Sequence, residues 1–533
     1  MRPRGSAGKG RPRRPVRDQA RNAAFDVVRA VAERDAYANL LLPKLLRERG
    51  ITGRDAALAT ELTYGTLRGL GTYDAIIDVC GDRAPDPVVR DALRLGAHQL
   101  LKMRVPPHAA VGTTVDLVRL RVGQGPAKFV NAVLRKIAGR TLEEWVAIVA
   151  PDPERDPAGH LSVAHSHPRW VVTAFRDALG PDAGETVEVL AADNERPLVT
   201  LVARPGRSSV KELRDAGAEP ARYSPYGAYL PEGDPGQIPA VAEARAAVQD
   251  EASQLVALAL TRVPIDGRDE RWLDLCAGPG GKAGLLDAIA THGDLEGATP
   301  SIQDGGSGGT PVGEAGEVSG PGGSGRIPAE EIGAAAGGAS LIGESGVSGV
   351  SGVSGAGGAG GRGSVRVFRG GARLVAADVQ QHRARLVRQA VGEAGVVTAD
   401  GTEPAWRPGT FDRVMLDAPC TGLGALRRRP EARWRRDPSG IAELSGLQRR
   451  LLVTALEAVR PGGVVAYVTC SPHLAETRVV VGDVLARRDD VEQLDARDYL
   501  PEVGGLGDGP HAQFWPHRHG TDAMFLALLR KRP

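Results

Sequence analysis

Two cysteines, each at the end of an apolar run, are the residues of this chain whose types and spacing suggest chemistry. The run 411–416 leads into Asp417 and Cys420, and the run 464–468 leads into Cys470. Both runs are typical of buried parallel strands, and open α/β sheets bind ligands beyond the carboxyl ends of their strands. If the strands are neighbours, two thiols and a carboxylate face one crevice, which suits nucleophilic attack on an electron-poor ring carbon. Either cysteine alone is better interpreted as a small buried hydrophobic residue.

A glycine-rich loop follows another expected strand, at 272–275. The loop consists of Cys276, Ala277, Gly278, Pro279, Gly280, Gly281 and Lys282, and a helix is expected over 283–290. Glycines let the backbone come close to a ligand, whose negative group then meets free N–H donors at the helix start. Phosphate, dinucleotide and S-adenosylmethionine loops all use this pattern. A Walker loop is excluded, because Cys276 and Ala283 stand where it requires Gly and Ser or Thr.

The spacing to the next acidic strand end narrows the ligand to one with a nucleoside. Asp378 lies 97 residues after Gly281, but 76 of these form the low-complexity block 291–366, which leaves 21. A carboxylate about 20 residues after the glycines is expected to hold ribose hydroxyls. Asp400 ends a third strand, where it either meets an adenine amino group or serves as a turn or cap residue. Hydride transfer stays open from this half of the crevice, and the two thiols in the other half decide against it.

The elements that must position these residues fall into three expected domains, so the fold class is multidomain. Residues 18–145 show helical periodicity, which predicts an all-α binding module. Residues 160–250 predict a small α+β linker domain. Residues 251–533 alternate strand and helix and predict an α/β Rossmann-like domain with a mostly parallel sheet. The block 291–366 holds no aromatic residue and predicts a disordered Gly/Ser-rich surface insertion. Residues 1–17 carry seven Arg or Lys and no acid, which predicts a basic disordered arm.

Composition bounds the class of protein. No apolar run of eighteen residues is present to span a membrane, and four cysteines give no disulfide framework. We therefore expect a cytoplasmic protein without a membrane partner, and a monomer. No His or Cys spacing indicates a metal, so none is expected.

Several of these motifs resemble known families. Residues 61–68 and 128–136 resemble the RNA-binding helical domain of NusB-like antitermination factors. The glycine-rich loop, the Asp-Ala-Pro-Cys segment ending at Cys420 and the Thr-Cys-Ser segment around Cys470 resemble the RNA 5-methylcytosine methyltransferases. Together with the helical front, the chain is similar to the bacterial 16S rRNA (cytosine-C5) methyltransferases of the RsmB/Sun/Fmu type. The resemblance covers nearly everything except 1–17 and 291–366, with Gly278 standing where Ala is commoner.

The resemblance implies a role for each matching residue. Cys470 would add to carbon 6 of a cytosine, Cys420 would assist release of the methylated product, and Asp417 would contact the base near N3. S-adenosyl-L-methionine would be the cofactor, bound by the loop 276–282 with Asp378, Asp400 and Asp417. The substrate would be RNA, most simply small-subunit rRNA. Spacing alone does not rank Cys470 over Cys420 as the nucleophile.

A basic segment just after Cys420 is expected to grip RNA. Arg427, Arg428 and Arg429 would engage phosphates, and Trp434 would stack on an unpaired base, although a plain solvated basic face is the alternative. Two rival functions remain: a tRNA rather than rRNA cytosine-5 methyltransferase, and a non-catalytic RNA-binding or ribosome-assembly factor on a methyltransferase scaffold. Methylation of an amino group is disfavoured, because the segment lacks the second Pro and the aromatic residue that this chemistry requires.

Overall fold

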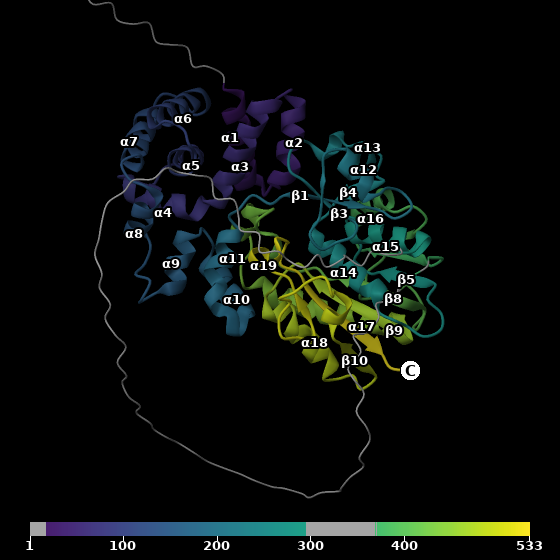
Figure 1. The fold of residues 1–533 in the computed structure, drawn as a ribbon. Coiled ribbons are helices and arrows are strands. Elements are labelled where there is room, and N and C mark those ends of the chain that lie inside the picture. Colours follow the sequence, from purple (N-terminus) through teal and green to yellow (C-terminus); the bar gives the residue numbers. More distant parts are fainter. Residues whose placement is uncertain (1–17, 295–367, 369, 404) are drawn as a thin grey trace, which may run out of the picture. The chain divides into compact units, whose positions relative to one another are not determined.

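The computed structural model describes residues 18–294, 368, 370–403 and 405–533 (Figure 1). The predicted arm 1–17 and nearly all of the predicted insertion 291–366 lie outside this part of the chain. Residues 291–294 do not, and the first two of them still belong to a helix. No described helix is both long and apolar enough to cross a membrane.

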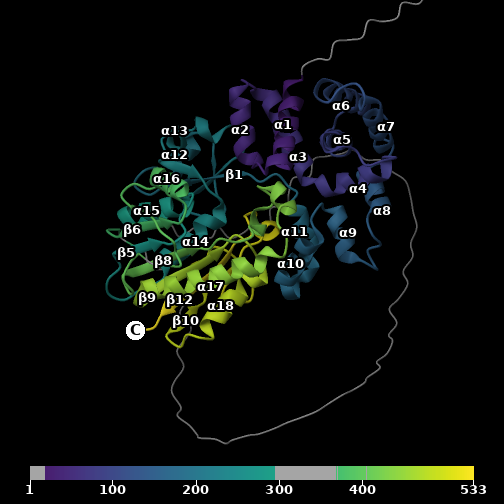
Figure 2. The same cartoon turned by 180° about the vertical axis from the view of Figure 1, so that it is seen from behind.

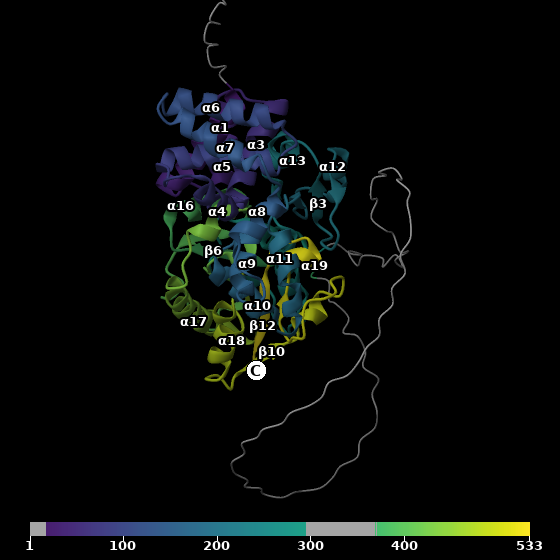
Figure 3. The same cartoon turned by 90° about the vertical axis from the view of Figure 1, so that its left-hand side faces the viewer.

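The first part of the chain is helical, as the periodicity predicts, and its helices continue to residue 192. They are α1 (Gln19–Arg34), α2 (Ala38–Glu48), α3 (Gly53–Arg68), α4 (Leu70–Cys80), α5 (Pro87–Leu101), α6 (Pro107–Arg121), α7 (Ala127–Ile137), α8 (Leu142–Val149), α9 (Pro157–Ala164), α10 (Arg169–Leu179), the 3-10 segment η1 (Gly180–Glu185) and α11 (Thr186–Ala192). Local signals set several starts: Pro occupies the first turn of α5 and α6, and Thr141 and Glu144 form a capping box at α8. Helices α3 to α7 pack together (Figure 3), and their apolar side chains contribute to one shared core.

A small antiparallel sheet comes next, with strand order β2-β3-β1-β4. Its elements are β1 (Val199–Ala203), α12 (Val210–Asp215), β2 (Glu219–Pro220), β3 (Gly227–Leu230), η2 (Pro235–Gln237), α13 (Pro239–Ala242) and β4 (Ala246–Val248). The sheet therefore occupies the second half of the range expected for the linker domain, and the first half is α9 to α11.

The last part is a sheet of eight strands with helices on both faces (Figure 2). Its elements are α14 (Glu251–Arg262), β5 (Arg271–Asp274), α15 (Gly281–His292), β6 (Arg373–Asp378), α16 (Gln381–Ala390), β7 (Gly395–Thr398), β8 (Phe411–Asp417), η3 (Leu423–Ala425), η4 (Pro430–Trp434), α17 (Gly440–Ala458), β9 (Val459–Thr469), η5 (Leu474–Glu476), α18 (Arg478–Leu485), β10 (Val491–Leu494), η6 (Ala496–Tyr499), β11 (Ala512–Gln513), α19 (Pro516–His519) and β12 (Phe525–Lys531).

The strand order β10-β12-β9-β8-β5-β6-β7 makes this a doubly wound fold. The five strands from β9 to the edge strand β7 are parallel, and β12 runs antiparallel to its neighbours β9 and β10. Alternate residues serve opposite cores: Trp272 packs with α14 and α15, whereas Leu273 packs with α17. The strand order reverses between β5 and β8, and such a reversal is where ligands bind.

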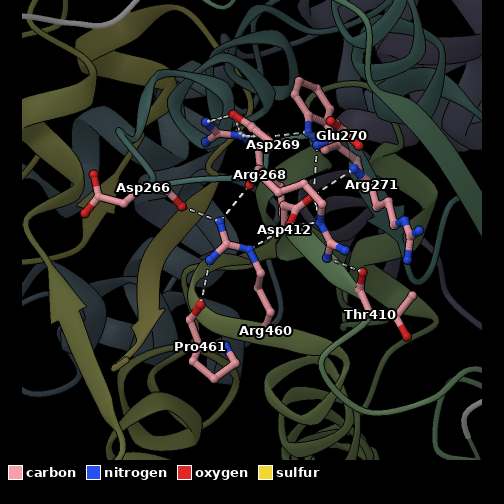
Figure 4. A network of polar contacts seen from close by, with 11 residues as sticks. Asp266, Arg268, Asp269, Glu270, Arg271, Thr410, Asp412, Arg460 and Pro461 are labelled. Carbon is pink, nitrogen blue, oxygen red and sulfur yellow. Dashed lines mark hydrogen bonds and ion pairs between the residues drawn. The ribbon is translucent and has the colours of Figure 1, made fainter.

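A buried carboxylate fixes the amino ends of the central strands (Figure 4). Asp412, fully buried on β8, accepts hydrogen bonds from the backbone N–H groups of Glu270 and Arg271 and from the guanidinium groups of Arg268 and Arg460. Burial alone would raise the pKa of Asp412, but these hydrogen bonds outweigh it and lower the pKa. The network stabilises the edge opposite to the one where the cysteines lie.

The described residues that flank 295–367 meet beside the sheet. The backbone N–H of Asp294, just after α15, donates a hydrogen bond of 2.7 Å to the carbonyl of Phe368. The Phe368 ring lies 4.8 Å from the Trp272 ring of β5, measured between centroids. Asp294 and Phe368, the described residues on either side of 295–367, therefore lie next to each other.

Candidate functional site

The two cysteines lie side by side beyond the ends of neighbouring strands. β8 and β9 are parallel, with Asp417 in register with Val468, so the segments that follow emerge at the same edge. The sulfur atoms of Cys420 and Cys470 are 3.3 Å apart and partly buried. The predicted neighbouring strands are thus confirmed, and the two thiols share one crevice.

The electrostatics distinguish the two thiols. The hydrogen bond between the two sulfurs lowers the pKa of Cys470, against burial and the Asp417 charge, and the Lys282 ammonium adds to the lowering. The same hydrogen bond, with burial, raises the pKa of Cys420 well above its ordinary value. The ionisations of the two thiols are therefore coupled, since either sulfur can donate the hydrogen bond between them, and the Lys282 ammonium favours a thiolate at Cys470.

Lys282 and Asp417 form an ion pair beside the sulfurs. The Lys282 Nζ lies 2.8 Å from the Asp417 Oδ2, and the Lys282 side chain is largely buried. Burial alone would lower the pKa of Lys282, but the charge of Asp417 and its hydrogen bond raise it overall. Lys282 therefore stays an ammonium at neutral pH, and it supplies positive charge at the reaction centre.

Glu476 holds both cysteine segments together, and the sequence motifs did not indicate it. Its fully buried carboxylate accepts hydrogen bonds from the backbone N–H and hydroxyl of Thr421, next to Cys420, at 2.7 and 2.5 Å. It also accepts one from the hydroxyl of Ser471, next to Cys470, at 2.6 Å. The available signal was a lone Glu a few residues past a strand end, which is too common to single out.

The glycine-rich loop turns from β5 into α15 as predicted. Gly280, the residue before α15, has φ of +110°, a conformation that favours glycine. Asp378 at the end of β6 accepts a hydrogen bond from the Gly278 N–H at 3.1 Å. The two predicted nucleoside-binding features are therefore in contact. Asp274 is fully buried at the end of β5, and burial, with the nearby Asp417 charge, raises its pKa to about 8.

One cavity of about 810 Å³ joins these features. Its lining includes Cys420, Cys470 and five of the residues expected to bind the cofactor: Cys276, Gly278, Asp378, Asp400 and Asp417. The remaining loop residues, Ala277, Pro279, Gly280, Gly281 and Lys282, are not part of the lining. Asp400 also accepts hydrogen bonds from the N–H and hydroxyl of Thr402, both at 2.8 Å, so it is a turn residue as well.

The basic segment divides into two groups, which differs from the expectation for it. Arg427 and Arg428 bind the buried carboxylates of Asp250 and Asp522, so their guanidinium groups hold α14 to the chain near β12 rather than facing RNA. Arg429 and Trp434 do line the cavity, and Arg435 and Arg436 join them there. Only this second group remains a predicted RNA contact.

No group of three or more His, Cys, Asp or Glu side chains in the described residues has metal-binding geometry.

Comparisons with known proteins match both ends of the chain. Residues 357–530 match the family described as 16S rRNA methyltransferase RsmB/F, and residues 18–139 match the NusB family. A putative methyltransferase of Mycobacterium tuberculosis (strain ATCC 25618 / H37Rv) is 48% identical over 98% of each chain. A probable ribosomal RNA small subunit methyltransferase B of Synechocystis sp. is 29% identical over 96% of this chain and 99% of that one. The crystal structure of PH0851 shares the fold, with a TM-score of 0.68 at 20% identity, over 97% of this chain and 99% of that one.

Proposed function

The chain belongs to the family of 16S rRNA methyltransferases RsmB/F, and from this premise we propose that it methylates carbon 5 of a cytosine in RNA. The methyl donor is S-adenosylmethionine, and small-subunit rRNA is the favoured substrate. The observation that carries the proposal is the pair of sulfurs, 3.3 Å apart, in the cavity that also contains Asp378 and Gly278. Methylation at an amino nitrogen has no use for two thiols, whereas methylation at carbon 5 does.

The residues of the cavity suit the cofactor. The loop Cys276–Lys282 offers backbone groups at the start of α15, and Asp378 offers a carboxylate at the end of β6, where ribose hydroxyls bind in doubly wound folds. When bound, S-adenosylmethionine supplies an electrophilic methyl group on a sulfonium.

The two thiols and the ion pair divide the work on the base. Carbon 5 of cytosine is a weak nucleophile until the Cys470 thiolate adds to carbon 6, which makes the ring an enamine. Asp417 contacts the N3 edge, where a proton must be gained as negative charge develops, and Lys282 stabilises that charge. After carbon 5 has taken the methyl group, the Cys420 thiolate accepts the proton of carbon 5. The electron pair of that C–H bond re-forms the ring double bond, and Cys470 leaves carbon 6 as a thiolate. Cys420 assists this release. The base reaches the thiols only if it is unpaired or flipped out of its stack.

Two cysteine variants test the proposal. Cys470→Ala is expected to abolish methyl transfer to rRNA while leaving cofactor binding, measured by calorimetry, unchanged. Cys420→Ala is expected to accumulate a protein–RNA adduct that survives denaturing gels, and the double variant should not form it. Absence of the adduct would falsify the two-thiol assignment. Bisulfite sequencing of RNA from cells with and without the protein identifies the modified cytosine and separates rRNA from tRNA substrates.

A further inference from the structure

The loop between α1 and α2, in the helical domain, reaches the catalytic cavity. Asp35 and Tyr37 line it, and every other lining residue is at position 275 or later. The cavity that contains both sulfurs therefore has a wall from the opposite end of the chain. Nothing in the catalytic motifs assigns a role to this wall.

The loop is bonded to the segment that follows Cys420. The backbone N–H of Ala38, the first residue of α2, donates a hydrogen bond of 3.2 Å to the buried carboxylate of Glu431. The Arg435 guanidinium donates to the carbonyl of Ala36 and lies 3.6 Å from the Asp35 carboxylate. These contacts fix the loop backbone on both sides of Tyr37.

The Tyr37 side chain itself remains accessible. It is 44% exposed, and the guanidinium carbons of Arg429 and Arg435 lie 5.7 and 5.1 Å from its ring centroid. Within the described residues, Arg429 has no carboxylate partner. Trp434, which is 40% exposed, lines the same cavity. An exposed ring beside an unpaired guanidinium is the combination with which proteins bind single-stranded nucleic acid, since the ring stacks on a base and the cation meets a phosphate.

We propose that Tyr37 and Arg429 bind the nucleotide next to the target base, so that the helical domain supplies part of the catalytic site. This inference rests on the proposed function and extends it. Tyr37 stacks on the neighbouring base, and Arg429 contacts its phosphate. A flipped cytosine leaves its neighbour without a stacking partner on one side, and an aromatic ring at the cavity wall replaces that partner. The loop backbone holds Tyr37 in place before RNA arrives, because its hydrogen bonds do not involve the ring.

Four variants test this in the full-length protein. Tyr37→Ala is expected to lower the affinity for a short single-stranded RNA containing the target cytosine by roughly 10- to 100-fold, measured by fluorescence anisotropy. Tyr37→Phe keeps the ring and should bind like the wild type. Leu40→Ala, at a side chain 69% exposed on α2 and outside the cavity, is the matched control and should also bind like the wild type. Tyr37→Leu carries the same prediction as Tyr37→Ala if the alanine variant does not fold.

Steady-state kinetics separate this role from a structural one. For Tyr37→Ala, the KM for RNA should rise while the KM for S-adenosylmethionine and the thermal unfolding midpoint stay at wild-type values. The inference is wrong if the KM for RNA and the KM for S-adenosylmethionine rise by the same factor. It is also wrong if Tyr37→Ala and Tyr37→Leu bind RNA with wild-type affinity. If the wild type itself transfers no methyl group to RNA, the proposed function is wrong. This result differs from a failure of the Tyr37 inference, because it is seen in the wild type and does not depend on the variants.

Discussion

Replacing Glu476 with Gln tests whether the buried carboxylate positions the two thiols. The carboxylate accepts three short hydrogen bonds, two from Thr421 and one from Ser471. In a Gln of the same shape, the carbonyl oxygen still accepts the hydrogen bond from the Thr421 N–H. The NH2 group then faces the hydroxyls of Thr421 and Ser471, which must rotate so that they accept instead of donating. Hydrogen bonds to a charged group contribute about 1 kcal/mol more than neutral ones. Over three bonds, Glu476→Gln should therefore lower the free energy of unfolding by about 3 kcal/mol.

The effect on catalysis should exceed the effect on binding. The two segments that Glu476 joins carry Cys420 and Cys470, and a displacement of reacting groups by about 1 Å costs on the order of 100-fold in rate. We expect the single-turnover rate of methyl transfer to fall by roughly this factor, with cofactor affinity unchanged, because none of the hydrogen bonds in the described residues joins the loop 276–282 to Glu476. Urea unfolding, rapid-quench transfer of labelled methyl groups and calorimetry measure the three quantities.

The matched control is Glu443→Gln, at an exposed position in the first turn of α17. Its unfolding free energy should stay within about 0.5 kcal/mol of the wild type. If Glu476→Gln is as stable and as fast as Glu443→Gln, the carboxylate does not position the thiols and the reasoning is wrong.

Three further outcomes are expected. Burial raises the pKa of Asp274 to about 8, so the folded state binds more protons than the unfolded state between about pH 4 and pH 8. The contribution of Asp274 to stability is therefore lost as pH rises through that window. In urea unfolding, the stability of Asp274→Asn should fall less from pH 5 to pH 8 than that of the wild type. If both proteins show the same fall, Asp274 does not have a raised pKa. Asp412→Ala leaves two arginines unpaired and should cost about 3 kcal/mol of stability by the same assay, without changing cofactor affinity, since it lies at the opposite edge of the sheet. Its pKa is lowered, so its stabilisation is present above about pH 4 and lost as pH falls further. Finally, deletion of 295–367, with two glycines joining Asp294 to Phe368, should leave the unfolding midpoint and methyl transfer at wild-type values, because the two ends already touch; an inactive deletion variant would show that the block has a function.

Local pattern was sufficient for the fold of the last domain. Four buried strands have apolar sequences that are typical of such strands, and each forms where the pattern predicts it. They end near Cys276, Asp378, Cys420 and Cys470. The spacing between Gly281 and Asp378, counted without the block 291–366, could also be recognised in the sequence. The reason is that the doubly wound fold fixes how far the second strand lies from the first. These signals are local, or depend on one known connection.

Contacts between segments that are far apart in the sequence could not be predicted from it. Arg427 and Arg429 look alike in a run of arginines, but Arg427 meets Asp250 and Asp522, which lie far away in sequence, and Arg429 has no such partner among the described residues. Tyr37 carries no motif and becomes part of the site only because the helical domain packs beside η4. What the sequence leaves open is which charges are paired, and pairing decides whether an arginine holds the fold or remains available to RNA.

The hydrogen bond between the sulfurs also explains how one pocket uses two thiols in turn. Before the reaction, the Cys470 thiolate is the main reason that the pKa of Cys420 is high, through its hydrogen bond and its negative charge. In the adduct that we propose, Cys470 is a neutral thioether, so both of these effects end, while burial and the charges of Glu476 and Asp417 still raise the pKa of Cys420. Under the proposed mechanism, Cys420 is therefore easier to ionise after the adduct forms than before it, which is when the proton on carbon 5 needs a base. A second permanently ionised group beside Asp417 would instead oppose ionisation of Cys470, so this order of events follows from the charges that the pocket already holds.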